Sequence, residues 1–339
     1  MLEFVRAKWL WAILFPFSSV WAVLSWTRRR TYHFRSSYRS KLKVICVGNI
    51  HSGGSGKTPV VAAISERYAG KPAIILSRGY GGHLSRTGAQ VNLQSKNGAQ
   101  NYGDEPWMLA SIQKAPVFID KNRTRGIKKI ESAFPNAFVV LDDGFQHLAL
   151  NRDINLVCIN TDKNPYANFC LPLGDLREPI SSINSSDAVV LTPGSQISGE
   201  TEWLVWLKKH FSKVPVFIAA LRVDGLFQGQ ERFYPAPNER LVSFCGIASP
   251  ERFIAEVCKL SSDAEHLKSF ADHHKYTQND IDSLILMVRD SANMVFVSTD
   301  KDWSKAHPFF AARGKKLYSL RMTYTLPQEF WHWLDGKLG

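Results

Sequence analysis

The chain has 339 residues, 45% of them hydrophobic and 21% charged, and a formal net charge of +12. This composition excludes an intrinsically disordered chain and leaves room for two domains with buried cores. The five cysteines show no C-x-x-C spacing, which argues against a zinc site or redox pair and favours a reducing compartment.

The positive charge is concentrated in residues 1–43, which hold nine basic side chains and one acid. Such a segment favours nucleic acid or an anionic lipid surface. Residues 9–26 are uncharged and include four tryptophans, which prefer the headgroup level of a bilayer, and three arginines follow at 28–30. We therefore predict a helix inserted partly into one leaflet, with a membrane span as the alternative, and no nucleic-acid partner.

The segment VICVGNIHSGGSGKTP (residues 44–59) reads as a buried strand, a glycine-rich loop and the start of a helix. Glycines let the backbone N–H groups curl around a polyphosphate, and the helix N-terminus favours the negative charge. Lys57 supplies a cation for the outer phosphates, and the Thr58 hydroxyl can bind Mg²⁺. The predicted nucleotide-binding residues are His51, Ser52, Gly53, Gly54, Ser55, Gly56, Lys57 and Thr58.

Two more segments of interest follow in the chain. SRGYGG (residues 77–82) is a second glycine-rich loop after a short strand, at the end of a strand where α/β sheets bind ligands. GDEP (residues 103–106) opens a predicted helix, and its acids either cap that helix or take part in magnesium or base chemistry. The residues alone leave both readings of GDEP open.

A basic cluster, Lys121, Arg123 and Arg125, follows the strand predicted at Val117–Ile119. Basic side chains at the carboxyl end of a strand can bind an anionic substrate, although a solvated helix face has the same composition.

Phe138–Leu141 is an apolar strand that ends in two adjacent carboxylates, Asp142 and Asp143. A buried strand that delivers an acid to the Mg²⁺ beside a phosphate loop is the Walker B arrangement. The pairing of this strand with the phosphate loop is a stronger signal than either alone. The sequence does not distinguish which of the two aspartates contacts the metal.

The strand and helix pattern restarts near Val214, with a helix predicted at Pro250–Leu260 and another at Asp280–Arg289. Between them lies ADHH (residues 271–274), whose spacing disfavours a metal site and whose histidines suit proton transfer near neutral pH. We predict an N-terminal helix with a basic segment at 1–40, a P-loop domain at 41–213 and a smaller α/β domain at 214–339.

Together these segments resemble one family, the tetraacyldisaccharide 4'-kinases of lipid A biosynthesis in Gram-negative bacteria. The matching pieces, in chain order, are VGNIHSGGSGKTP, SRGYGG, GDEP, DDGFQH, LPLGDLREP, ADHH and TDKD. Their order is more telling than any single piece. The family also lacks the first glycine of the usual phosphate-loop pattern, so His51 at that position is not a departure.

The resemblance implies transfer of the ATP γ-phosphate to the 4'-hydroxyl of a tetraacylated glucosamine disaccharide 1-phosphate, with Mg²⁺ as cofactor. It implies a P-loop NTPase-like α/β/α sandwich as the kinase domain and a second, smaller α/β/α domain. It also implies attachment to the cytoplasmic face of the inner membrane, where the partners are the acylated substrate and anionic lipids. We expect a monomer, although the sequence itself does not reveal the oligomeric state.

By the same resemblance, Asp104 takes the proton of the sugar hydroxyl, His273 assists it as a dyad, and Lys57 completes the catalytic set. Glu105 and Thr58 lie around Mg²⁺ together with Asp142 or Asp143. Because Asp104 and His273 fall in different predicted domains, we predict that domain closure assembles the pair. The residues expected to bind the lipid substrate are Arg78, Arg123, Gln146 and Arg177.

The main alternative is a regulatory P-loop GTPase or ATPase docked on the membrane. A GTPase of that class reads guanine with Asn-Lys-x-Asp after a strand. The nearest segment, Thr299–Asp302, carries Asp300 where that motif needs Asn and lies far downstream.

Overall fold

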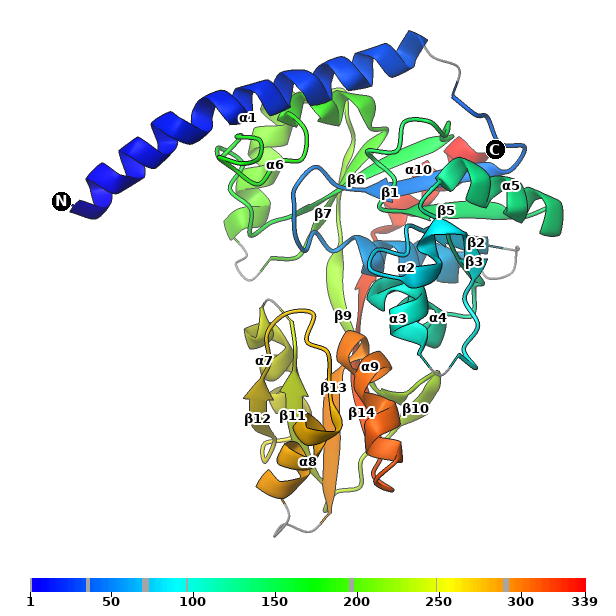
Figure 1. Cartoon of the computed structure of the whole chain (residues 1–339), viewed down its shortest axis with the longest axis vertical. Helices are drawn as coiled ribbons and strands as arrows, with labels where there is room; N and C mark the ends of the chain where they lie inside the picture. Colours follow the sequence, from blue (N-terminus) through cyan, green and yellow to red (C-terminus); the bar gives the residue numbers. More distant parts are fainter. Residues whose placement is uncertain are drawn as a thin grey trace. The chain divides into compact units, whose positions relative to one another are not determined.

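The structure is a computed structural model, which describes residues 2–34, 37–68, 73–95, 97–194, 198–247, 249–288 and 293–339. The chain forms two compact units (Figure 1). Unit 1 comprises Met1–Arg78, Asn122–Ala220 and Tyr324–Gly339, and unit 2 comprises Gly79–Lys121 and Leu221–Thr323. The units interleave along the chain, whereas the sequence pattern predicted consecutive domains, because residues 79–121 pack with the C-terminal half.

Unit 1 contains a parallel sheet in the order β2-β5-β1-β6-β7-β8. Its strands are short and, apart from the half-buried edge strand β8, almost wholly buried, as expected for parallel strands covered on both faces. The strands are β1 (Lys43–Gly48), β2 (Ala73–Ser77), β5 (Phe138–Asp142), β6 (Ile154–Asn160), β7 (Ala188–Thr192) and β8 (Val216–Ile218). The helices are α1 (Leu2–Phe34), α2 (Lys57–Arg67), α5 (Arg123–Ala133), η2 (Ile180–Ser185), α6 (Ser198–His210) and α10 (Gln328–Leu338).

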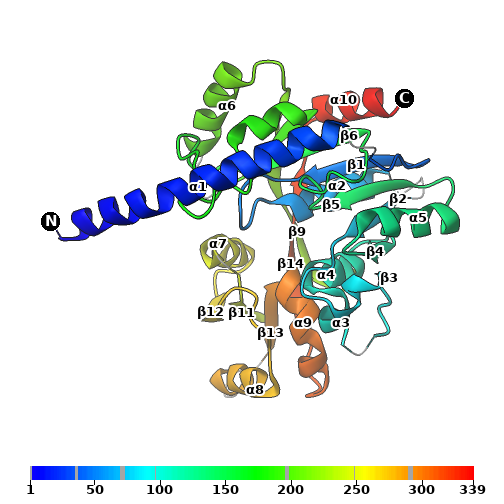
Figure 2. The ribbon, with the colours of Figure 1, turned by 45° about the horizontal axis from the view of Figure 1, so that its top comes forward.

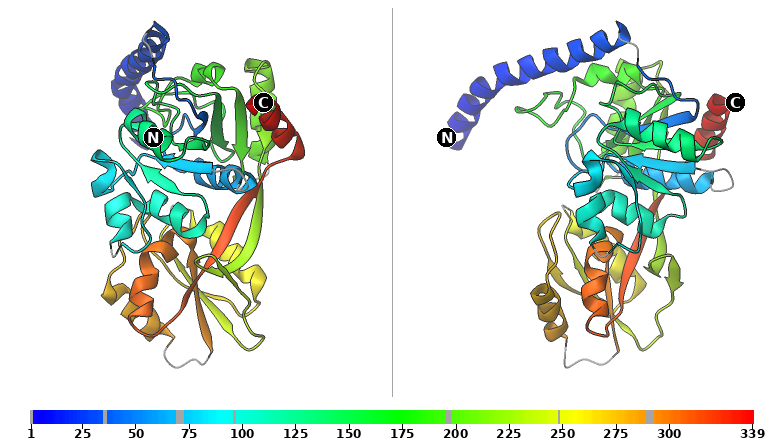
Figure 3. Two further views of the ribbon diagram at one scale, coloured as in Figure 1. Left: turned by 90° about the vertical axis from the view of Figure 1, so that its right-hand side faces the viewer. Right: turned by 45° about the vertical axis from the view of Figure 1, so that its right-hand side comes forward.

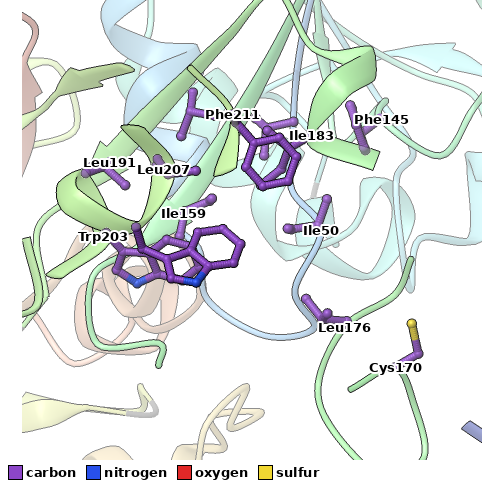
Figure 4. Packing of buried hydrophobic residues seen from close by; sticks show 13 residues of the cluster. Ile50, Phe145, Ile159, Cys170, Leu176, Ile183, Leu191, Trp203, Leu207 and Phe211 are labelled. Carbon is purple, nitrogen blue, oxygen red and sulfur yellow. The ribbon is translucent and has the colours of Figure 1, made fainter. Parts of the chain in front are cut away.

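A hydrophobic cluster joins α6 to β6 and β7 through Trp203, Ile159 and Leu191 (Figure 4). The same cluster includes Ile50, which follows β1, and Phe145, which follows β5. The core of unit 1 therefore continues directly beneath the loops that carry the predicted phosphate site.

Helix α1 docks on the LPLGDLREP segment (residues 171–179). The Ser18 hydroxyl donates to the Cys170 carbonyl at 2.7 Å, and the Trp21 indole N–H donates to the Arg177 carbonyl at 3.0 Å. Figures 1 and 2 show the N-terminal part of α1 extending beyond the rest of unit 1. Exposed apolar side chains on the described part of α1 are Trp11, Ile13, Phe15, Phe17, Val20, Trp21, Val23, Leu24 and Trp26.

None of the described helices has both the length and the apolarity needed to cross a bilayer. The partial insertion of α1 into one leaflet stays a prediction.

Unit 2 contains a second sheet in the order β10-β9-β14-β13-β11-β12. Figure 3 shows β9 and β14, which cross the division between the units, side by side. The strands are β9 (Ala220–Gln228), β10 (Glu231–Phe233), β11 (Arg240–Cys245), β12 (Glu265–Ser269), β13 (Met294–Thr299) and β14 (Leu317–Thr325). The helices of this half are α7 (Pro250–Leu260), α8 (Gln278–Met287) and α9 (Asp300–Ala311).

Alternate residues of β11 and β13 pack on opposite faces of this sheet, as the period of a strand requires. Phe244 and Phe296 meet α8 and α9 on one face, while Leu241 and Val297 meet α7 on the other. The predicted second α/β/α layer structure is therefore confirmed.

The rest of unit 2 is the segment 79–121, which is anchored on α9. The Trp107 indole N–H donates to the Ser304 carbonyl at 3.0 Å, and a Cβ at Gly98 would lie 2.3 Å from the Trp107 ring. Only glycine fits that close approach. The elements of this segment are η1 (His83–Arg86), β3 (Ala89–Gln90), α3 (Gly98–Tyr102), α4 (Asp104–Ile112) and β4 (Val117–Ile119), with β3 and β4 antiparallel.

A buried ion pair secures α1, which allows a stability prediction. The Arg29 guanidinium lies 2.6 Å from the Glu178 carboxylate and 4.2 Å from the centre of the Phe145 ring. In Arg29→Met the carboxylate would remain buried without its cation, so we expect a loss of about 3–5 kcal/mol in the free energy of unfolding. Urea unfolding in detergent, followed by tryptophan fluorescence, measures it.

Arg30→Met is the matched control, because Arg30 is exposed on the same helix and stacks on Trp26. We expect this variant to lose no more than about 1 kcal/mol. Equal losses in the two variants would contradict the importance of the buried pair.

Candidate active site

The phosphate loop connects β1 to α2, and its shape depends on glycine. Gly53 and Gly56 adopt positive φ angles of 87° and 67°. A Cβ at Gly56 would lie 2.9 Å from the Thr192 side chain, whose hydroxyl donates to the Ser55 carbonyl at 3.1 Å. Because α2 begins at Lys57, its unpaired backbone N–H groups face the loop and form a site suited to an anion.

His51 is a buried part of this loop. Its imidazole ring packs edge-on against Trp203, with the ring centres 6.0 Å apart. Burial lowers the pKa of His51 to about 4, so the ring is neutral at pH 7. Any contact of His51 with a nucleotide would therefore come through its backbone.

The LPLGDLREP segment pairs with the start of the loop. The Arg177 N–H donates to the Ile50 carbonyl, and the Ser52 N–H donates to the Asp175 carbonyl, both at 2.7 Å. This backbone pairing brings the Arg177 side chain to the phosphate site.

Asp143 joins three segments of the site. Its carboxylate lies 3.4 Å from Lys57 Nζ and 3.1 Å from Arg177 Nη1, and its φ of 49° turns it out of the strand direction. Burial opposes the ionisation of Asp143, but Lys57 and Arg177 outweigh it, so its pKa lies below the ordinary value. The structure thus brings together the phosphate-loop lysine, Asp143 directly after strand β5, and Arg177.

Asp142 is the buried last residue of β5 and lies beside Val47 of β1. The Ser77 hydroxyl donates to its Oδ2 at 3.0 Å. Thr58, Asp142 and Asp143 all belong to unit 1 and present the hard oxygen donors that Mg²⁺ prefers. Among the described residues no group of three or more His, Cys, Asp or Glu forms a metal site, and Mg²⁺ needs only one or two carboxylates besides phosphates and waters.

Arginines surround the DDGFQH segment (residues 142–147). Arg123 is buried and its Nη2 donates to the Asp143 carbonyl at 3.4 Å. Gln146 Nε2 donates to the Asn49 carbonyl at 2.8 Å. Burial, and then the charges of Arg123, Arg152, Arg28 and Arg78, lower the pKa of His147 to about 4.

Sequence reasoning missed two of these arginines and His147 as site residues. Arg152 Nη1 donates to the Gly144 carbonyl at 3.0 Å, and Arg28 Nη2 donates to the Gln146 carbonyl at 3.3 Å. Neither arginine lies in a recognisable motif, and Arg28 belongs to the basic run that follows the apolar segment. Only the DDGFQH motif itself could have drawn attention to His147.

The predicted dyad lies within unit 2. Asp104 is the first residue of α4, and its Oδ2 lies 3.4 Å from His273 Nδ1. His273 has a positive φ of 59°, and its N–H donates to Asp272 Oδ1 at 2.9 Å. The prediction that domain closure is needed to assemble this pair is wrong, because residues 79–121 fold with the segment that carries His273.

The remaining predicted residues are exposed. Glu105 follows Asp104 in the first turn of α4 in unit 2, whereas Thr58, Asp142 and Asp143 belong to unit 1. Arg78 is the first residue after β2.

A phosphate loop whose lysine contacts an aspartate at the end of a neighbouring parallel strand defines a P-loop nucleotide-binding protein. Residues 10–339 match the sequence model of the family described as LpxK, tetraacyldisaccharide-1-P 4'-kinase. The chain therefore belongs to the tetraacyldisaccharide 4'-kinase family, as the order of its motifs predicted.

Two curated relatives and one solved structure agree with this assignment. The tetraacyldisaccharide 4'-kinase of Desulfotalea psychrophila is 33% identical, over 95% of this chain and 94% of its own. The tetraacyldisaccharide 4'-kinase of Vibrio cholerae is also 33% identical, over 88% of this chain and 84% of its own. The crystal structure of LpxK from Aquifex aeolicus in complex with ATP has a TM-score of 0.77 at 25% identity, covering 97% of this chain and 98% of that chain.

The environment of His147 predicts a pH dependence of stability. Its pKa falls from 6.5 to about 4 on folding, so between these values the unfolded chain binds more protons than the folded one. Above pH 6.5 neutral His147 therefore makes its full contribution to the free energy of unfolding. This contribution is lost as the pH falls towards 4. Relative to His147→Gln, the wild type should lose on the order of 1 kcal/mol more between pH 7 and pH 4.5.

Urea unfolding at both pH values measures this difference. His332→Gln, which removes an exposed histidine of α10, should leave the pH dependence as in the wild type. The prediction would be contradicted if the free energy of unfolding fell by the same amount between the two pH values in the wild type and in His147→Gln.

Proposed function

We propose that this protein transfers the γ-phosphate of ATP to the 4'-hydroxyl of a tetraacylated glucosamine disaccharide 1-phosphate in lipid A biosynthesis. The observation that carries the proposal is the contact of Lys57 with Asp143 at the phosphate loop, in a chain that matches the 4'-kinase family from residue 10 to 339. The similarity of the chain to the tetraacyldisaccharide 4'-kinase of Desulfotalea psychrophila and to the LpxK structure in complex with ATP supports the same substrates.

In this proposal the phosphate loop binds ATP. Backbone N–H groups from Gly53 to Thr58 face the phosphates, and Lys57 and Arg177 stabilise the charge that develops on the transferred group. Mg²⁺, held by Thr58 and by Asp142 or Asp143, would neutralise charge on the phosphates. Phosphoryl transfer needs mainly positioning and charge stabilisation, which these side chains can supply.

The dyad in unit 2 handles the proton of the acceptor. A sugar hydroxyl does not ionise unaided at neutral pH, so Asp104 accepts its proton as the new O–P bond forms. The bond from the γ-phosphorus to the bridging oxygen breaks in the same step, and ADP leaves. His273 faces the same carboxylate and can take up the proton.

The substrate is a membrane lipid, which accounts for α1. Its exposed tryptophans and aliphatic side chains suit the interface of a bilayer, and the basic residues beside them suit anionic headgroups. We place the protein as a monomer on the cytoplasmic face of the inner membrane. Arg78, Arg123, Gln146 and Arg177 are the candidates for binding the phosphorylated sugar.

Transfer of ³²P from labelled ATP to a tetraacyldisaccharide 1-phosphate in detergent micelles tests the function. We expect a lipid product labelled at the 4' position, loss of labelling with EDTA, and a decrease of about 100-fold or more in Lys57→Met. Release of inorganic phosphate without any labelled lipid would instead support the membrane-docked ATPase or GTPase.

The dyad has its own test in Asp104→Asn and His273→Gln. Each substitution removes a proton acceptor but keeps the size of the side chain, so we expect kcat to fall by about 10²–10⁴-fold with little change in KM for ATP. Asp282→Asn, in an exposed pair with Arg313, is the control and should keep the wild-type kcat. Wild-type kcat in either dyad variant would remove that residue from the mechanism.

A further inference from the structure

Lys305 on α9 is a buried lysine beside the dyad. Its side chain is 7% exposed, and its Nζ lies 3.7 Å from Asp104 Oδ2 and 3.8 Å from Asp302 Oδ1. The same ammonium donates to the His274 carbonyl at 2.9 Å and lies 5.6 Å from the centre of the Tyr276 ring. Lysine is rarely buried unless it is paired, so this placement demands an explanation.

Asp302 gives this lysine a rigid anchor. Its side chain is fully buried, and its Oδ2 accepts from the Gly246 N–H and the Thr299 hydroxyl, both at 2.8 Å. A Cβ at Gly246 would come within 3.1 Å of Asp302 Oδ1, so the backbone passes close to the carboxylate. Asp302 is therefore fixed from two sides before it meets Lys305.

Lys305 is linked on its other side to the dyad of Asp104 and His273. Lys305 Nζ and His273 Nδ1 face the same oxygen, Oδ2, of Asp104. Among the described residues no hydrogen bond or ion pair reaches Oδ1, which can therefore point to an acceptor hydroxyl. The Trp107 indole, bonded to the carbonyl of Ser304, ties α4 to α9 one residue before Lys305.

Lys305 also contacts the loop that carries His273. Its bond to the His274 carbonyl reaches the residue directly after His273, whose φ of 59° is unusual for a non-glycine residue. One ammonium group thus touches the carboxylate of the dyad and the backbone beside its histidine. A displacement of either partner by about 1 Å can cost on the order of 10²-fold in rate.

We propose that Lys305, anchored by Asp302, is a positioning residue that holds the Asp104 carboxylate and the His273 loop in the geometry needed for proton transfer. This inference rests on the proposed function, because the positioned step is the removal of the proton from the acceptor hydroxyl. Lys305 acts through Asp104 and does not itself contact the substrate.

The test compares Lys305→Met, which keeps the apolar stem and removes the charge, with Lys305→Arg, which keeps the charge. We expect Lys305→Met to lower kcat by about 30-fold or more with KM for ATP changed less than about 2-fold. Lys305→Arg should recover kcat to within about 5-fold of the wild type, because it restores a cation to Asp104 and Asp302. A purely structural lysine would give both variants the same kcat per folded molecule.

Arg313→Met is the matched control, since it breaks the Arg313–Asp282 pair beyond the C-terminal end of the same helix. It should lower stability without lowering kcat. If Lys305→Met does not fold, Asp302→Asn weakens the anchor at nearly constant shape and should lower kcat by at least about 5-fold. A kcat within 2-fold of the wild type in Lys305→Met, or in Asp302→Asn when that variant replaces it, would overturn the inference.

A second readout does not depend on lipid phosphorylation. The ¹⁵N chemical shifts of the His273 ring, assigned with His273→Gln, report the contact of Nδ1 with Asp104, and Asp104→Asn supplies the spectrum of the broken contact. We expect Lys305→Met to move these shifts towards that reference. If the wild type does not phosphorylate the lipid, the proposed function fails, while unchanged His273 shifts in Lys305→Met would overturn the role of Lys305.

Discussion

The contact of Asp143 with Lys57 and Arg177 is the interaction on which the site in unit 1 depends. The sheet makes it possible, because β1 and β5 are parallel neighbours whose carboxyl ends meet at one edge. The left-handed backbone at Asp143 then turns its carboxylate towards the lysine. Opposite charges attract strongly in such a partly buried place, so three segments far apart in sequence are held together at the phosphate loop.

The same contact extends to α1. Arg177 belongs to the segment on which α1 docks, through the Trp21 indole and through the neighbouring Glu178, which pairs with Arg29. The helix that we expect at the lipid surface therefore touches the segment that supplies a cation to the phosphate site. Within unit 1, α1 contacts the backbone of Arg177, whose side chain pairs with Asp143 at the phosphate loop, so a change in the docking of α1 would act on Arg177.

Much of the fold could be predicted from the sequence, because β1 and β5 are continuous apolar runs that end in a glycine loop and in paired acids. The assignment of residues 79–121 to unit 2 could not, since the bond from Trp107 to Ser304 joins positions far apart and leaves no local pattern. The pairing of Asp104 with His273 followed only from the family resemblance. Lys305 gave no signal, because one lysine in an amphipathic helix usually faces solvent.

Each unit pairs a lysine with a carboxylate. In the proposed reaction the acting group of the pair is the lysine in unit 1 and the carboxylate in unit 2. In unit 1 an acid, Asp143, holds Lys57, which is the group that meets the phosphates in the proposed reaction. In unit 2 the cation of Lys305 lies beside Asp104, which is the group proposed to meet the hydroxyl. Burying either charge alone would be costly, so each acting group needs a partner of opposite sign, and the partner's fixed position also determines where the acting group points. Charge compensation and positioning are thus achieved by one contact in each unit.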